Sequence, residues 1–212
     1  MEFVDNDQIR SILFEISKNK ILPNFRNLNS NQINYKNNKD IVTSVDIEVE
    51  NYLKKTLPQF LKNSYFIGEE IYTHNPEILE YYNQNRYCWT VDPIDGTLNF
   101  VKGKETFAVM VALTFSNEII QSWIYKPITQ EFMYAKLNNG TFLNDKKITI
   151  NNFNSISNSV GSISSKYWEK DLDQKIKLLK KNFKEINSYG SIGCEYFDMV
   201  LGKRDFAILS KL

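Results

Sequence analysis

Two aspartates three positions apart, Asp92 and Asp95, are the side chains of this chain whose type and spacing best suit chemistry. An apolar, β-prone run at 87–91 precedes them, and Gly96 and Thr97 follow. Hard carboxylate oxygens beside backbone N–H groups suit a divalent cation that holds a phosphate. Asp, Pro and Gly also favour turns for purely conformational reasons. The spacing alone therefore leaves two interpretations open, a cation and phosphate site or an ordinary Asp-Pro turn.

The apolar run predicts the strand that must position these acids. Trp89 and Val91 are typical of a buried strand. Pro93 has no N–H for a central ladder, so we expect this strand to end at about Asp92. The acids would then lie at the carboxyl end of a strand, where α/β folds usually place their sites. Gly96 would let the backbone approach a neighbour closely or adopt positive φ.

Asp46 is a second candidate, from a different part of the chain. Acids at Glu48 and Glu50 precede Lys54, and this order of charges complements a helix dipole, which predicts a helix from about 46 to 62. Asp46 could serve as its N-cap, a role worth about 1 kcal/mol. A cap residue also lies at the edge of a helix, so the cap role and a site role are compatible.

Glu69 and Glu70 form a third candidate. They follow a short apolar strand predicted at 65–67, and Gly68 allows a sharp bend before them. Adjacent glutamates are often solvated surface residues, so a surface role and a site role both stay open. The only histidine, His74, has no partner motif and is interpreted as a surface residue.

Three motifs together resemble the inositol monophosphatase family of metal-dependent phosphatases. Residues 92–100 match the family signature DPxDGTxNF at every fixed position. Residues 40–46 resemble its D-x-V-T-x-x-D motif, and residues 68–70 resemble its GEE motif. The resemblance extends over essentially all 212 residues.

The resemblance implies a role for each candidate. It implies a Mg²⁺ site whose ligands are Glu69, Asp92, the Ile94 carbonyl and Asp95. It also implies that Thr97 and Asp46 orient and help to deprotonate the attacking water, with Glu69 and Glu70 as the other catalytic residues. The substrate-binding residues that it implies are Asp95, Gly96, Thr97, Gly193 and Cys194.

The predicted fold class is α+β, a layered α-β-α-β-α sugar-phosphatase-like fold with a truncated C-terminal part. A helix is predicted at 5–22, with Pro23 after its end, and strands from 107 onward form an antiparallel meander. An Asn- and Ser-rich stretch near 150–158 suggests a boundary between a metal-binding domain at 1–150 and a partial α/β domain at 151–212. The second part is predicted to hold strands at 160–164, 185–189 and 205–209, a helix at 171–182 that buries Ile176, Leu178 and Leu179, and a helix at 191–200.

Two features differ from the family pattern. The family continues into a W-D motif whose Asp completes a second metal position, and no Trp-Asp pair occurs here, so we expect a truncated chain or a fragment. Leu209 stands near the position where inositol-specific members carry a Glu that binds a sugar hydroxyl, which puts inositol specificity in doubt.

These features leave several functions open. The first is a Mg²⁺-dependent phosphomonoesterase that acts on a small polyol or sugar phosphate. Histidinol phosphate and a 3′-phosphonucleotide are alternative substrates, although Leu98-Asn99 after the DGT resembles the inositol type. A non-catalytic family member is the alternative from another class.

The composition limits the kinds of binding partner that we expect for this chain. The formal net charge is +1, which gives no electrostatic argument for nucleic acid. Cys88 and Cys194 are the only cysteines and lie in separate motifs, so a disulfide framework is not expected and a reducing cytoplasm fits. No stretch has the roughly 20 apolar residues of a membrane helix, and the start lacks a signal peptide pattern. The expected partner is a small phosphate monoester, without nucleic acid or membrane, and a homodimer is left open.

Overall fold

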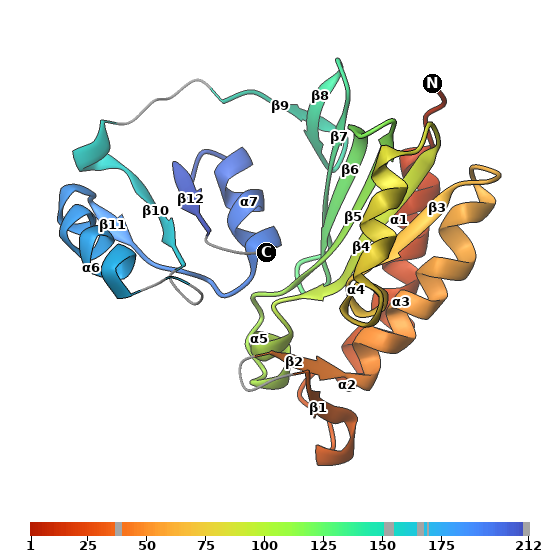
Figure 1. The fold of residues 1–212 in the computed structure, drawn as a ribbon, viewed down its shortest axis with the longest axis horizontal. Helices are drawn as coiled ribbons and strands as arrows, with labels where there is room; N and C mark the ends of the chain where they lie inside the picture. The colour runs from red at the N-terminus through yellow and green to blue at the C-terminus, as the bar shows by residue number, and fades with distance from the viewer. Residues whose placement is uncertain (37–39, 151–154, 165–167, 169, 210–212) are drawn as a thin grey trace.

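A seven-stranded sheet and a three-stranded sheet, separated by a helix, organise the computed structural model of this chain (Figure 1). The structure describes residues 1–36, 40–150, 155–164, 168 and 170–209. Figure 1 shows α6, the small sheet, α7, the large sheet and the pair α1 and α3 in succession. The predicted layered α-β-α-β-α arrangement is therefore confirmed.

The large sheet has the order β3-β4-β5-β6-β7-β8-β9. Only β3 and β4 pair in parallel, and the later strands form the predicted antiparallel meander. Its strands are β3 (Tyr65–Gly68), β4 (Tyr87–Asp95), β5 (Ala108–Phe115), β6 (Glu118–Lys126), β7 (Glu131–Lys136), β8 (Gly140–Leu143) and β9 (Lys146–Ile148).

One face of this sheet packs against α1 (Asn6–Ile16) and α3 (Ser44–Thr56). The apolar face of α1 is buried as its helical spacing predicts, and Trp89 and Trp123 stack beneath the helices with ring centroids 5.9 Å apart. Burying one large apolar side chain contributes about 1.5–3 kcal/mol relative to leaving it exposed. This main core holds β4 rigidly against α3, and both elements carry candidate site residues.

Some predicted element boundaries are wrong. The first helix does not end before Pro23: a π-helical turn at Ser17–Ile21 follows α1, and Pro23 lies inside the short α2 (Leu22–Asn24). Proline is tolerated there because the first turn of a helix needs no N–H donor from it. A two-stranded hairpin follows, formed by β1 (Ile33–Tyr35) and β2 (Ile41–Thr43).

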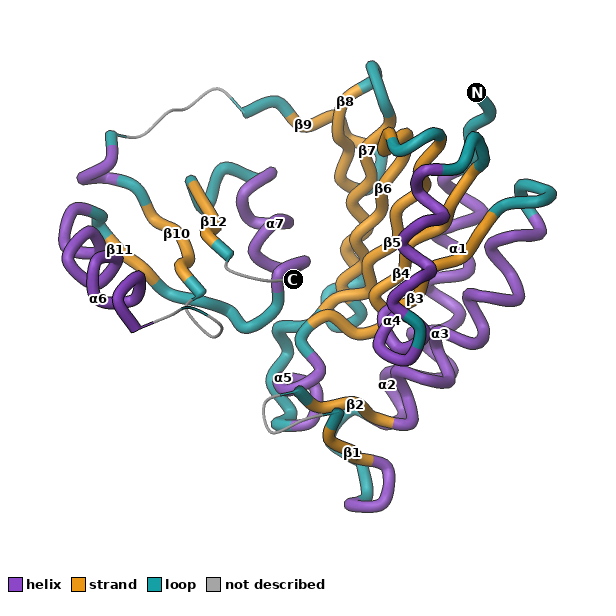
Figure 2. The backbone as a smooth tube through the Cα atoms, in the orientation of Figure 1, coloured by secondary structure: helices purple, strands orange, loops and turns teal. Residues whose placement is uncertain are grey.

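The small sheet lies across α7 (Ile192–Val200) from the large one (Figure 2). Both of its outer strands pair in parallel with β10. Its elements are β10 (Val160–Ile163), α6 (Lys170–Leu179), β11 (Glu185–Ile186) and β12 (Phe206–Ile208). The predicted burial of Leu178 and Leu179 is wrong, because both side chains are more than half exposed on α6. The helix type was predicted correctly, and of the three apolar residues only Ile176 is partly buried.

The predicted boundary between two domains falls in the connection between the two sheets. Residues 151–154, on which the predicted boundary falls, lie outside the described residues. The division at 150 therefore stays a prediction. Within the part of the chain that the structure describes, no helix is both long enough and apolar enough to span a membrane.

Candidate active site

Strand β4 continues past Pro93 to Asp95, so the predicted end at Asp92 is wrong. Asp92 pairs with Met110 and Asp95 with Ala108, which leaves two residues of β4 opposite one residue of β5. Such a bulge accommodates a proline and re-aims the side chains beyond it. Residues three apart on a regular strand point to opposite faces. The extra residue corrects this parity, and both aspartates line the same cavity.

Gly96 ends this strand in the left-handed region, with φ of 90°, and opens α5 (Thr97–Val101). The expectation of positive φ is confirmed. A Cβ here would lie 3.0 Å from the Ser191 Cβ and 3.2 Å from the Gly190 carbonyl oxygen. The close approach predicted for this glycine is therefore an approach to the chain segment that leads into α7.

Asp46 and Thr97 meet although they are 51 residues apart. The Thr97 hydroxyl donates to Asp46 Oδ1 at 3.1 Å and to the Ile94 carbonyl at 3.0 Å. Asp46 is not the N-cap of α3: Thr43 holds that position, and Asp46 is the third residue of a capping box with it. Burial, with a smaller effect of the nearby Glu69 carboxylate, raises the pKa of Asp46 to about 6 against the lowering effect of these hydroxyl and N–H donors.

Glu69 and Glu70 form the first turn of α4 (Glu69–His74), directly after β3. Residues 71–83 hold the rest of α4 and then a 3₁₀ helix at Pro76–Asn83. His74 is exposed at the end of α4, as predicted. Burial raises the pKa of Glu70 to about 7, despite an ion pair that stabilises its carboxylate.

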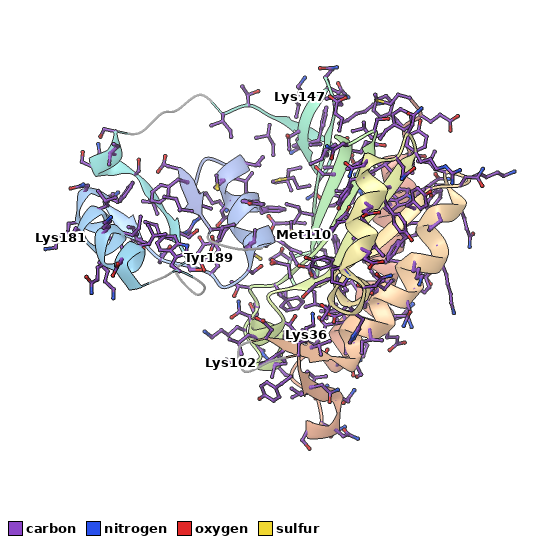
Figure 3. The ribbon with its side chains drawn as sticks, viewed as in Figure 1. Lys36, Lys102, Met110, Lys147, Lys181 and Tyr189 are labelled. Carbon is purple, nitrogen blue, oxygen red and sulfur yellow. The ribbon has the colours of Figure 1, made fainter. Side chains whose placement is uncertain are left out.

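Lys36 supplies that ion pair, and the sequence analysis assigned it no role at the site. Its ammonium lies 2.8 Å from Glu69 Oε1 and 2.7 Å from Glu70 Oε1 (Figure 3 labels it). Its side chain is only 12% exposed. The polar residues around this short strand gave no indication of the pairing, because Lys36 meets acids that lie more than 30 positions further along the chain.

Asp92 differs from the other acids of the group in its hydrogen bonding. Its Oδ1 is buried without a hydrogen-bond partner among the described residues. Burial, then the nearby carboxylates of Glu69, Asp95 and Asp46, raise its pKa well above the ordinary value. An unpartnered carboxylate oxygen among like charges is what a divalent cation would relieve, so the donor set fits such an ion in kind.

The same acids are not arranged as a finished metal cage. No group of three or more His, Cys, Asp or Glu side chains among the described residues is placed so that it could hold a metal ion as it stands. Two contacts explain this arrangement. Lys36 takes up an oxygen of Glu69, and the Asp95 carboxylate is turned toward the beginning of α7.

Asp95 accepts hydrogen bonds from the Ile192 N–H at 3.0 Å and the Gly193 N–H at 2.7 Å, and also from the Ser191 hydroxyl. Cys194 N–H donates to Ser191 Oγ, the cap of α7. Burial raises the pKa of the Cys194 thiol to about 11, so it is an inert side chain. Of residues 191–194, Ser191 and Ile192 line the cavity, whereas the predicted substrate-binding residues Gly193 and Cys194 are not among its lining residues.

The cavity beside the acids has a volume of 420 Å³. Leu209 lines this cavity, and so does Glu195, a buried acid to which the sequence motifs gave no role. Glu195 accepts from the Ser162 and Ser188 hydroxyls and from the Tyr189 N–H. Asn99 joins the two parts of the chain by donating to the Tyr189 carbonyl at 2.7 Å.

Comparisons with known proteins agree on one family. The model described as "Inositol monophosphatase family" matches residues 5–212. An inositol monophosphatase of Dictyostelium discoideum is 34% identical over 189 residues, which cover 88% of this chain and 67% of that protein. A fructose-1,6-bisphosphatase/inositol-1-monophosphatase of Thermotoga maritima is 28% identical over 171 residues, with coverage of 80% and 62%. This chain thus spans roughly two thirds or less of the length of these relatives.

Solved structures show the same fold. The inositol monophosphatase structure from Thermotoga maritima superposes with a TM-score of 0.77 at 24% identity, over 95% of this chain and 74% of that one. Inositol monophosphatase II from Staphylococcus aureus gives a TM-score of 0.77 at 22% identity, over 94% of this chain and 70% of that one.

Proposed function

We propose that this chain, which belongs to the inositol monophosphatase family, is a magnesium-dependent phosphomonoesterase of a small polyol or sugar phosphate. Members of the family generally depend on a metal ion. The observation that carries the proposal is the buried, unpartnered oxygen of Asp92 among the carboxylates of Glu69, Asp95 and Asp46. A purely structural acid cluster would leave this repulsion without compensation.

In this proposal, Glu69, Asp92, the Ile94 carbonyl and Asp95 hold Mg²⁺, which prefers such hard oxygen ligands. When bound, the ion supplies Lewis-acid charge that lowers the pKa of water and stabilises charge on the phosphoryl group. Glu69 would exchange its ion pair with Lys36 for the ion, and Asp95 would share its carboxylate between the ion and α7. In this proposal, the contacts of Glu69 with Lys36 and of Asp95 with α7 are the reason why the described acids do not already converge on one metal position.

The protein's own side chains would handle the proton. Thr97 and Asp46 are already joined by a hydrogen bond of 3.1 Å, so the hydroxyl can orient a water and pass a proton to the carboxylate. The raised pKa of Asp46, about 6, suits acceptance of a proton near neutral pH. Glu70 would support the same water, and Glu69 contributes by holding the ion.

For the substrate, Asp95, Gly96, Thr97, Gly193 and Cys194 are the residues proposed from the family motifs. Gly193 would act through its backbone N–H, which donates to the Asp95 carboxylate at 2.7 Å. Leu209 cannot accept a hydrogen bond from a sugar hydroxyl, and it lines the cavity. This puts specificity for inositol in doubt, so the proposed substrate is a small polyol or sugar phosphate similar to inositol monophosphate. Histidinol phosphate and a 3′-phosphonucleotide stay as alternatives. A relative of similar fold, SaIMPase-II, has been solved both with 2′-AMP and with inositol monophosphate bound. The cytoplasmic location and a homodimer belong to this proposal as well.

The test is phosphate release from purified protein across a panel of polyol, sugar, histidinol and nucleotide phosphates, with and without Mg²⁺. We expect Mg²⁺-dependent release that Asp95→Asn abolishes. The absence of divalent-dependent release at high protein concentration would contradict the proposal.

A second candidate function is a non-catalytic module that keeps the fold and a weak cation site. The Lys36 ammonium against Glu69 and Glu70 favours it, because it partly neutralises the acids without any metal. Turnover by the wild-type chain that is lost in Asp95→Asn would exclude this candidate.

A further inference from the structure

Glu50 is a buried acid on α3 that no motif assigns to the site. Its side chain is 3% exposed, and both carboxylate oxygens accept backbone N–H groups from α4. Glu70 N–H donates to Oε2 at 2.8 Å, and Ile71 N–H donates to Oε1 at 3.1 Å. The first N–H groups of a helix have no partner inside the helix, so Glu50 caps α4 from a different helix.

Gly68 makes this cap sterically feasible. It is the N-cap residue of α4 and offers no side-chain cap of its own. A Cβ at Gly68 would lie 2.2 Å from both Cδ and Oε2 of Glu50, far inside contact distance. Its φ is −107°, so the glycine is required for space and not for an unusual backbone conformation. Gly68, the first residue of the GEE motif, therefore leaves the space that the Glu50 carboxylate occupies.

We propose that Glu50 is a positioning residue, which fixes the first turn of α4 and thereby the directions in which Glu69 and Glu70 extend toward the cation. This inference rests on the proposed function, because it concerns the same acids. Glu50 itself contacts only the α4 backbone in these hydrogen bonds. The Cα–Cβ direction of each glutamate is set by the backbone whose N–H groups Glu50 holds.

A packing role alone does not explain an acid at this position. Burying a carboxylate near Glu69 is unfavourable, and both effects raise the pKa of Glu50. An apolar side chain would fill the space without that cost. The two short N–H contacts are what a carboxylate adds, and they act on the residues that carry the site. Groups that orient metal ligands typically change metal affinity by 10–100-fold when they are removed.

The first experiment measures Mg²⁺ binding by calorimetry in the wild-type protein, Glu50→Ala, Glu50→Gln and the control Glu48→Gln. Glu48 lies two residues earlier on α3, is exposed and pairs with Lys20, so its variant removes the same charge without touching α4. We expect the Mg²⁺ dissociation constant to rise about 10–100-fold in Glu50→Ala and less in Glu50→Gln, which keeps one acceptor. Glu48→Gln should stay within about twofold of wild type, by the weak effect of exposed charges.

The outcomes separate this inference from the proposed function. If the wild-type chain binds no divalent cation, the proposed function fails. If the wild type binds and Glu50→Ala binds equally well while its melting temperature falls, Glu50 is only structural and the inference is wrong. Should Glu50→Ala fail to fold, Glu50→Gln, which has nearly the same shape, decides the question by the same titration.

A second comparison uses the clash between Gly68 and Glu50. Gly68→Ala should displace the Glu50 carboxylate, lowering both the melting temperature and the Mg²⁺ affinity. In the double variant Gly68→Ala with Glu50→Ala, the new methyl group occupies vacated space, so the melting temperature should recover relative to Gly68→Ala. The Mg²⁺ affinity should stay weak because the cap is still missing. Recovery of wild-type affinity in the double variant would overturn the inference.

Discussion

Asp92 in the large-sheet region and Glu195 in the C-terminal region both have carboxylate oxygens withdrawn from solvent, yet the surroundings of these oxygens are opposite. Glu195 accepts from two serine hydroxyls and one backbone N–H, so donors compensate its charge. The buried Oδ1 of Asp92 has no donor among the residues that the structure describes, and acidic neighbours add repulsion. The comparison teaches that the donors around a buried acid, and not burial itself, distinguish a structural carboxylate from a candidate cation ligand.

The strongest test of this comparison replaces the carboxylate by an amide at each of the two acids. Asp92→Asn should abolish Mg²⁺ binding, with an affinity loss of at least about 100-fold, because a charged ligand is removed. In metal-free protein it should raise the melting temperature, since it removes repulsion from a buried acid. Calorimetric titration and thermal unfolding without metal measure the two effects. A lower metal-free melting temperature would show that Asp92 is a structural acid like Glu195.

Glu195→Gln should have the opposite effect on stability. The amide replaces an acceptor with a donor among groups that already donate, which costs about 1–3 kcal/mol. This corresponds to a fall of about 2–4 °C in melting temperature for each kcal/mol in a chain of this size. Mg²⁺ affinity should not change. A large loss of Mg²⁺ affinity without loss of stability would place Glu195 with the cation-site acids.

The pH dependence of stability sharpens the comparison further. The folded protein raises the pKa of Asp46 to about 6 and of Glu70 to about 7, above their ordinary values of 3.8 and 4.5. Their protonation therefore favours the folded state fully below about pH 4, and this contribution is lost as the pH rises through about 7. We expect the melting temperature of metal-free protein to fall across this window and saturating Mg²⁺ to reduce the fall. A metal-free melting temperature that rises from pH 5 to 7 would contradict the assignment of these shifts.

The smallest expected effect concerns Lys36. Lys36→Met removes the ammonium that compensates Glu69 and Glu70, so the metal-free melting temperature should fall. Mg²⁺ affinity should increase a few-fold, because no positive charge then has to leave Glu69. The control is Lys181→Met, a change at an exposed lysine in the C-terminal region, labelled in Figure 3. Weaker Mg²⁺ binding in Lys36→Met would mean that the ammonium assists the ion.

The sequence predicted the candidate acids far better than it predicted their geometry. Residue types and local spacing make Asp46, Glu69, Asp92 and Asp95 candidates but leave a turn, cap or surface role open, and the resemblance to the family implies their roles at a site. The bulge after Asp92 could not be predicted, because it depends on the register against β5. Lys36 and Glu50 were also missed as site residues, since their partners lie 20 or more positions away.

By itself, the sequence determined the family, the α+β class and which oxygen-bearing residues are available, since local patterns and motifs encode these properties. Only the tertiary structure decided which donors meet each acid. Glu195 accepts hydrogen bonds, and Glu69 forms an ion pair with Lys36. Asp92 lies among other carboxylates. The physical reason is that the free energy of a buried carboxylate depends on neighbours a few ångströms away, and folding brings those neighbours from distant segments.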